Sequence, residues 1–293
     1  MNILYLMFNN FANLFIEYNA SIITSILGQN VFAKYQVRRV YESSNVVNKY
    51  LPDDELQKPE SAVLEELRGK LPEMRMLDIG VGAGRTTNFF APLAKEYVGI
   101  DFSNSMIKAC RLKYPSLTFE VGDARKLGHF KNQYFDFVMF SFNGIDNVEH
   151  EERLAILHEV RRVLRKNGTF CFSTLNLNAW SLKPPFRFSK NPVILYRSTY
   201  DFLLNHRIWE TLKQKEKPQH MMAYYRYKDY LIRNYFITPS EQLKQLKDAG
   251  FSNTKLYDLN TGRVLNNPTE TMDYWVYFLT KANDRKSECY VQH

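Results

Sequence analysis

Three glycines and two acidic residues occupy positions that suit the binding of a nucleotide-like cofactor. Gly80, Gly82 and Gly84 follow an apolar stretch and precede a helical pattern, which is the setting of a nucleotide-binding glycine loop. Without Cβ atoms, such a loop turns tightly and lets a ligand approach its main-chain N–H groups. Asp101 ends the next apolar stretch, where a carboxylate can accept hydrogen bonds from two ribose hydroxyls. Asp123 follows the third, where it can accept one from the amine of adenine.

Each of these two acids also has a plainer interpretation. Asp101 could cap the helix that begins after Ser103, and Asp123 could be a solvated turn residue. A fourth apolar stretch ends in polar residues, with Ser141 and Asn143 at its end and Asp146 shortly after. Open α/β sheets bind ligands at the carboxyl ends of their strands, so we expect these side chains beside the same site.

Alternating strand and helix patterns would position these residues. From Met74 onward the alternation is typical of a parallel α/β sheet covered by helices on both faces. The predicted strands are Met74–Ile79, Glu96–Ile100, Leu117–Val121, Phe135–Phe140, Thr169–Thr174, Thr254–Leu259 and Tyr274–Thr280. Seven strands are therefore expected.

Helix signals fall between the strands. Ser103 can cap a helix that runs toward Lys113, and a second helix is predicted from about Glu151 to Arg165. A third helix begins at Thr238, whose hydroxyl can cap it, with Pro239 in the first turn.

The alternation of strand and helix patterns stops over residues 176–236, which are rich in aromatic residues. A segment this long inside a domain is usually a functional insertion. We predict an N-terminal helical extension over residues 1–50, a cofactor-binding domain over 51–175 and 237–282, an aromatic and basic cap over 176–236, and a frayed tail over 283–293.

The motifs together resemble those of a known family. LDIGVGAGRTT, YVGIDFSNSMIKACR, VGDAR, FDFVMFSFNGIDNV, LHEVRRVLRKNGTFCFST and TPSEQLKQLKDAGF occur in the order and spacing of class I S-adenosylmethionine-dependent methyltransferases. The resemblance covers about Met74–Thr280, excluding most of the insertion. It implies a Rossmann-like seven-stranded sheet with its last strand antiparallel, S-adenosyl-L-methionine as cofactor and S-adenosyl-L-homocysteine as product.

The resemblance also implies roles for individual residues. Asp78, Gly80, Gly82 and Gly84 would hold the methionine portion of the cofactor. Asp101 would bind the ribose, and Asp123 would bind the adenine amine. The residues that would flank the adenine or lie near the sulfonium are Phe102, Met106, Ala124, Phe140, Ser141, Phe142 and Asn143. Tyr41 or Tyr50 would close over the cofactor from the N-terminal side.

Methyl transfer from a sulfonium is an in-line displacement, so much of the catalysis can come from alignment and exclusion of water. A neutral amine acceptor needs no dedicated base, whereas a hydroxyl usually does. The catalytic candidates are Asn143 for orientation, Asp146 as base or amine anchor, and His206 and His220 in the insertion. His150 and His158 fit a helical surface pattern.

The insertion is expected to cap the acceptor pocket with aromatic walls. Of the net charge of +8, most lies here, because residues 176–236 contain 11 Lys/Arg and 4 Asp/Glu. Arg187, Arg197, Arg226 and Arg233 could hold an acceptor carboxylate or phosphate. The alternative is a solvated basic face on a cap whose aromatics form their own small core.

Other features narrow the class of protein. Three distant cysteines give neither a disulfide framework nor a zinc site, so we expect reduced thiols in a cytoplasmic protein and no bound metal. The first 28 residues are apolar with helical spacing but too interrupted to span a membrane. We expect them to pack on the catalytic domain or on a second subunit, which would make a homo-oligomer. A membrane-surface helix and a start at Met7 are the alternatives.

The favoured function is methylation of N or O on a small acceptor, aromatic or anionic. The rivals are an RNA or protein methyltransferase that docks through the basic insertion, and a non-catalytic cofactor-binding module. A nucleic acid partner ranks below a small molecule because the basic charge is confined to one segment. The absence of an Asp/Asn-Pro-Pro-Tyr/Phe motif after the fourth strand also disfavours methylation of nucleic acid bases.

Overall fold

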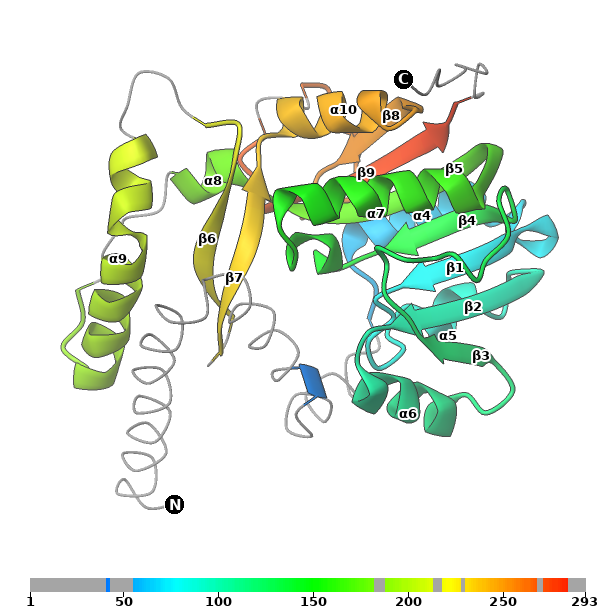
Figure 1. Ribbon diagram of the computed structural model, residues 1–293, viewed down its shortest axis with the longest axis horizontal. Coiled ribbons are helices and arrows are strands. Elements are labelled where there is room, and N and C mark those ends of the chain that lie inside the picture. The colour runs from blue at the N-terminus through cyan, green and yellow to red at the C-terminus, as the bar shows by residue number, and fades with distance from the viewer. Residues whose placement is uncertain are drawn as a thin grey trace, which may run out of the picture.

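A central, mostly parallel sheet carries helices on both of its faces (Figure 1). The computed structural model describes residues 41–42, 55–181, 188–212, 218–227, 230–267 and 271–283. The strands are β1 (Arg75–Ile79), β2 (Glu96–Asp101), β3 (Thr118–Val121), β4 (Phe135–Phe140), β5 (Leu164–Asn176), β6 (His220–Tyr227), β7 (Tyr230–Ile237), β8 (Phe251–Tyr257) and β9 (Trp275–Ala282). All seven predicted strands are present among them.

The sheet has the topology of a doubly wound α/β fold. Its path runs β3-β2-β1-β4-β5-β7-β6, and β1 to β5 pair in parallel. The last strand, β9, is antiparallel to both β5 and β8. The Rossmann-like sheet with an antiparallel last strand is therefore confirmed. Since β1 and β4 are buried almost throughout, their sequences are continuous apolar runs rather than alternating ones.

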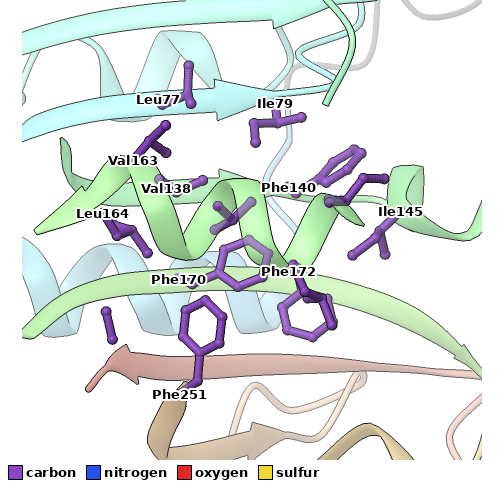
Figure 2. Close-up of a cluster of buried hydrophobic side chains, with 14 of the residues drawn as sticks. Leu77, Ile79, Val138, Phe140, Ile145, Val163, Leu164, Phe170, Phe172 and Phe251 are labelled. Atoms are coloured by element: carbon purple, nitrogen blue, oxygen red, sulfur yellow. The ribbon is translucent and has the colours of Figure 1, made fainter. Parts of the chain in front are cut away.

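Two hydrophobic cores lie on the opposite faces of this sheet. Leu77 and Val138 point into one core, whereas their neighbours Met76 and Phe137 point into the other. Figure 2 shows the first core, in which the rings of Phe170 and Phe172 stack and Phe251 packs at a tilt against Phe170. Because side chains of a strand alternate between faces, burial on both sides fixes the strand register.

The helices begin and end where local signals place them. They are α4 (Lys58–Leu67), α5 (Thr87–Phe90), α6 (Asn104–Lys113), α7 (His150–Val163), α8 (Leu177–Ser181), α9 (Pro192–Leu212) and α10 (Pro239–Asp248), with short 3-10 turns η1 (Leu71–Glu73) and η2 (Gly144–Asp146). The Ser103 hydroxyl accepts from the Met106 amide at 3.2 Å, and Thr238 accepts from Glu241 at 3.3 Å. Both predicted caps are confirmed. The predicted helix after Glu151 ends two residues early, at Val163, because β5 begins at the next residue.

The insertion contains two strands that the sequence analysis missed. β6 and β7 form an antiparallel hairpin, and β7 continues the sheet by pairing in parallel with the last two residues of β5. Figure 1 shows the hairpin beyond the carboxyl ends of β1 and β4, with α9 on its outer side. β5 runs to Asn176, which gives β7 a free strand edge to pair with.

Several predictions fall outside the described residues. These are the helix expected within residues 1–28, the oligomer it would form, the lid role of Tyr50, and the tail beyond residue 283. Cys110 and Cys171 are buried free thiols. No helix within the described ranges is both long enough and apolar enough to cross a membrane.

Candidate active site

The candidate site is a cavity of about 490 Å³ at the carboxyl ends of β1, β2, β3 and β4. This volume lies within the range of small-molecule sites. Nine of the eleven predicted cofactor residues line it, namely Gly80, Gly82, Asp101, Phe102, Met106, Asp123, Ala124, Ser141 and Phe142. The structure therefore brings together residues spread over more than sixty positions of the sequence. Their contacts with a cofactor stay predictions.

Gly82 and Asp101 form the centre of the cavity wall. Gly82 has a φ of +56°, and a Cβ added to it would meet no atom within 4 Å, so its backbone faces open space. The Gly82 amide donates to Oδ2 of Asp101 at 3.0 Å, and the Ser103 amide donates to Oδ1 at 2.8 Å. Burial raises the pKa of Asp101 to about 6, although these amides favour the charged form. Near neutral pH the carboxylate keeps lone pairs for a ligand's hydroxyls.

Asp78 and Gly84 lie behind the loop rather than on the cavity wall. The Asp78 carboxylate is buried and accepts from the Thr86 hydroxyl at 2.6 Å and from the Tyr97 hydroxyl at 2.7 Å. Burial raises the pKa of Asp78 to about 6. A Cβ at Gly84 would come within 2.7 Å of the Tyr114 ring. Both residues support the loop through internal contacts, and their role at the methionine portion of the cofactor stays a prediction.

Tyr41 extends the cavity wall from the N-terminal side. Its ring meets Phe102 edge-on with the centroids 5.7 Å apart, and its carbonyl accepts from the Ser103 hydroxyl at 2.9 Å. Met106 lies on the first turn of α6 and also faces the cavity. This arrangement supports the predicted role of Tyr41 as a cover over the cofactor and of Phe102 and Met106 as flanking groups.

Asp123 is held by a cation that sequence reasoning did not single out. Arg125 donates from Nη2 to Oδ2 of Asp123 at 2.6 Å and also bonds to Glu152 on α7. Partial burial opposes ionisation of Asp123, but the hydrogen bonds from Arg125 outweigh it and lower the pKa of the carboxyl. Arg125 and Glu152 both line the cavity. Any bond from adenine to Asp123 would therefore be shared with Arg125.

A buried network fastens the end of β4 to the glycine loop. Glu60 on α4 is fully buried, and Arg85 donates to its two oxygens at 2.5 and 2.6 Å. Ser141 also donates to Glu60, and the Tyr277 hydroxyl does so at 2.9 Å. The Arg85 guanidinium lies 5.2 Å from the ring centre of Phe142. The network holds Ser141 and Phe142 at the cavity, and nothing in the sequence near Glu60 indicated it.

Asn143 adopts an unusual backbone conformation beside the cavity. Both Phe142 and Asn143 have positive φ angles, 56° and 60°. Non-glycine residues in this region carry strain that often marks functional sites. The Asn143 amide donates to the Ser173 hydroxyl at 2.8 Å, while its side-chain Oδ1 is buried and has no hydrogen-bond partner. An unpaired acceptor at this point supports its predicted orienting role.

Asp146 is corrected as a candidate base. Its side chain is fully buried, and Arg153 donates to it at 2.6 Å, as does the Thr174 hydroxyl. The Leu175 amide donates to its second oxygen at 2.7 Å. Burial raises the pKa of Asp146 to about 6, opposed mainly by the charge of Arg153. The carboxylate joins η2, α7 and the end of β5, and it does not line the cavity.

The histidines lie at the seam between the hairpin and α7. His220 on β6 stacks on His150 with the ring centres 4.3 Å apart and the planes 2° from parallel. His150 Nδ1 lies 2.7 Å from the Tyr235 hydroxyl. Neither histidine lines the cavity, so His220 would need the hairpin to move before it could act as a base. His150 was expected on the surface, but the hairpin covers it, whereas His158 is exposed. The His206 side chain is outside the described part of the chain.

Some aromatic and basic residues of the insertion take part in packing within the fold. Trp180 and Phe236 are buried in a small third core with Leu175 and Leu212. Arg233 pairs with Glu149 at the start of α7. Arg197 is half-buried, and the side chains of Arg187 and Arg226 are not described. Two of the insertion's aromatics thus lie in a small core, whereas Phe188 and Tyr196 are exposed.

Known proteins resemble the chain over these same elements. Residues 76–168 match a family described as a methyltransferase domain. The match covers about a third of the chain, from β1 into β5, and we call this segment the methyltransferase domain. This methyltransferase domain contains the glycine loop, Asp101, Asp123 and the strained turn after β4.

Curated relatives match the chain over part of its length. The demethylmenaquinone methyltransferase of Renibacterium salmoninarum is 34% identical over 100 residues, which are 34% of this chain and 40% of that protein. That of Streptomyces griseus is 30% identical over 116 residues, 40% of this chain and 47% of that protein. The chain therefore spans less than half of either relative. An uncharacterized protein of Methanocaldococcus jannaschii is 24% identical over 216 residues, 72% of this chain and 83% of that protein.

Solved structures share the fold over most of the chain. The CcbJ methyltransferase from Streptomyces caelestis has a TM-score of 0.56 and 16% identity, covering 83% of this chain and 98% of that one. A S-adenosylmethionine-dependent methyltransferase from Clostridium acetobutylicum has a TM-score of 0.54 and 14% identity, covering 82% and 97%. At these identities the likeness shows the fold alone.

Proposed function

We propose that the protein transfers a methyl group from S-adenosylmethionine to N or O of a small molecule. The observation that carries the proposal is the open cradle formed by Gly82 and Asp101. A backbone without a Cβ and a buried carboxylate with free lone pairs face one cavity of suitable volume. The ribose of the cofactor requires a carboxylate that accepts from its hydroxyls. The methionine portion requires a backbone that it can approach closely.

Each part of the cavity would hold one part of the cofactor. Asp101 would accept from the ribose hydroxyls, and Phe102 and Met106 would flank the adenine. The glycine loop would lie along the methionine portion, with Ser141 and Phe142 near the sulfonium. When bound, the cofactor supplies an activated methyl group. The chain's own contribution is to align the acceptor and exclude water.

The acceptor would enter where the turn after β4 meets the hairpin. Asn143 would orient it through the unpaired Oδ1. For a hydroxyl acceptor, His220 or His206 would serve as base, and His220 would reach the cavity only if the hairpin moved. The quinone-type acceptor in the names of the curated relatives suits a small aromatic molecule. Since the chain spans less than half the length of these relatives, the site carries more of the argument for the acceptor's class than their names do.

Calorimetric titration with S-adenosylhomocysteine tests the proposal. Micromolar binding corresponds to about −8 kcal/mol. Asp101→Ala removes two hydrogen bonds to a charged group and is expected to weaken binding about a hundredfold or more. Glu65→Ala is the matched control, because its carboxylate is exposed on α4. If the folded wild-type protein does not bind, the proposal is wrong.

The two rival functions give different outcomes. A non-catalytic module would bind S-adenosylhomocysteine but methylate nothing in a pool of acceptors supplied with labelled donor. An RNA methyltransferase would bind RNA with a steep salt dependence that charge reversals in residues 176–236 abolish. In the described structure, Arg233 pairs with Glu149. Its positive charge is therefore already compensated on the surface that RNA would contact.

A further inference from the structure

Three charged side chains of the cavity wall are joined by ion pairs. Arg125 pairs with Asp123 on one side and with Glu152 on the other, and all three line the cavity. Asp123 lies close to Asp101, because the Gly122 amide just before it donates to the Asp101 carbonyl at 2.9 Å. A base attached to a ribose at Asp101 would therefore lie near this group of charges.

The carboxylate of Asp123 is already occupied by Arg125. Its Oδ1 accepts from the Arg125 amide and from Nε, both at 2.9 Å. Its Oδ2 accepts from Nε at 3.0 Å and from Nη2 at 2.6 Å. An ionised carboxylate has about four acceptor sites, and these contacts use them. The amine of a base could bond to Asp123 only by displacing Arg125 from one of them.

Glu152 holds the same guanidinium from the side of α7. Its Oε1 accepts from Nη1 of Arg125, and its Oε2 accepts from the Glu149 amide at 3.3 Å, at the start of that helix. Among the described residues, the Arg125 guanidinium bonds only to Asp123 and Glu152. Arginine is therefore anchored both on the loop after β3 and on α7, rather than hanging free at the cavity.

The anchored guanidinium still has hydrogens to offer a ligand. It carries five N–H groups in a fixed fork, and the bonds to the two carboxylates leave one on Nη1 and one on Nη2. The Arg125 side chain is 32% exposed and lines the cavity. A guanidinium donates hydrogen bonds and accepts none. It suits an oxygen or a ring nitrogen of a base, and it does not suit an amine, which is itself a donor.

We propose that Arg125 is a specificity-determining residue for the base: it withdraws Asp123 from the ligand, so that the site does not select a 6-amino purine over a 6-oxo purine. The inference rests on the proposed function and concerns the groups that contact the base of the same cofactor. A free carboxylate would favour the amine of adenine. A carboxylate filled by Arg125, with guanidinium hydrogens beside it, would not.

Calorimetric titration of the full chain with two matched ligands tests the inference. S-adenosylhomocysteine carries an amine at position six of its purine, and S-inosylhomocysteine carries an oxygen there. The wild-type protein should bind the two within about threefold of each other. Arg125→Ala frees Asp123 and should favour S-adenosylhomocysteine by about tenfold or more, the worth of a hydrogen bond to a charged group. Asp123→Ala added to Arg125→Ala should remove this preference. Arg68→Ala is the control, because its side chain is exposed on α4, and it should leave both affinities unchanged.

The outcomes separate the inference from the function on which it rests. A wild-type preference for S-adenosylhomocysteine of tenfold or more would overturn the inference, since the amine would then reach Asp123 despite Arg125. An unchanged ratio in an Arg125→Ala protein that still binds S-adenosylhomocysteine would overturn it as well. The wild-type ratio decides by itself if the variant does not fold. Failure of the folded wild-type protein to bind either ligand overturns the proposed function.

Discussion

The cofactor side and the insertion of this protein differ in how their polar groups are held. At the cofactor side, Asp101 is fixed by backbone amides from the glycine loop and from the start of α6. In the insertion and its seam with α7, polar side chains bond one another, as His150 does with Tyr235, or keep one unpaired oxygen, as Asn234 does. The residues at the sheet edge are therefore positioned by local backbone contacts, whereas those of the insertion depend on how the hairpin packs.

The largest expected effect is on the free energy of unfolding, and it concerns Asp146 between the two regions. Asp146→Ala leaves Arg153 buried without its counter-charge, which is expected to lower the free energy of unfolding by about 3–5 kcal/mol. Chemical denaturation measures this loss. Glu65→Ala, which breaks an exposed ion pair, should change it by less than about 1 kcal/mol. A loss at Asp146 as small as this control would contradict its structural role and restore it as a candidate base.

The next largest expected effect is a pH dependence of the affinity for S-adenosylhomocysteine, caused by Asp101. The pKa of Asp101 is raised to about 6, so the carboxyl takes up a proton as the pH falls through that value. Protonation removes an acceptor, and the affinity for S-adenosylhomocysteine should fall up to about tenfold for each further pH unit. Titrations at several pH values measure the step. Asp101→Asn should abolish it, and a step that persists in this variant would assign it to another group.

A substitution in the glycine loop separates binding from stability. Gly82→Ala places a Cβ into open space at a positive φ, which should cost about 1–2 kcal/mol of folding free energy. Because that space is where the cofactor would lie, S-adenosylhomocysteine binding should be lost in a protein that remains folded. Thermal unfolding and calorimetry measured together show both quantities. Normal affinity would mean that the cofactor does not approach Gly82.

The smallest effect concerns the histidine stack in the seam. Burial, helped by the nearby His150, lowers the pKa of His220, so its folded form favours the neutral ring. The facing groups are His150 and Arg153 on α7, Tyr235 on β7 and Glu241 on α10. A lowered folded pKa gives stability that is complete above the unfolded value near 6.5 and is lost as the pH falls below it. His220→Phe should flatten this acid dependence by about 1 kcal/mol or less in thermal unfolding. An unchanged slope would exclude His220 as its source.

The cofactor side could be predicted because its signals are local. The glycine loop, Asp101 and Asp123 each follow a strand by one or a few residues, so the parallel sheet brings them together without further information. Asp78 and Gly84 carry the same signal but face inward, and only the contacts with Tyr97 and Tyr114 reveal this.

The remainder of the site depends on contacts between distant residues. Glu60 meets Tyr277 from 217 positions away, and Arg233 meets Glu149 from 84 positions away. The hairpin was missed because β6 and β7 follow no β-α alternation. His150 was placed on the surface because its helix pattern gives no sign that the hairpin covers it. Such tertiary pairings override local patterns.

A crystal structure of the protein with S-adenosylhomocysteine would test the central claim most directly. The account predicts both ribose hydroxyls on the Asp101 carboxylate, the adenine between Phe102 and Met106, and the sulfur directed toward Phe142 and Asn143. A ligand bound elsewhere, or bound here with its ribose away from Asp101, would contradict the assignment of this cavity as the cofactor site.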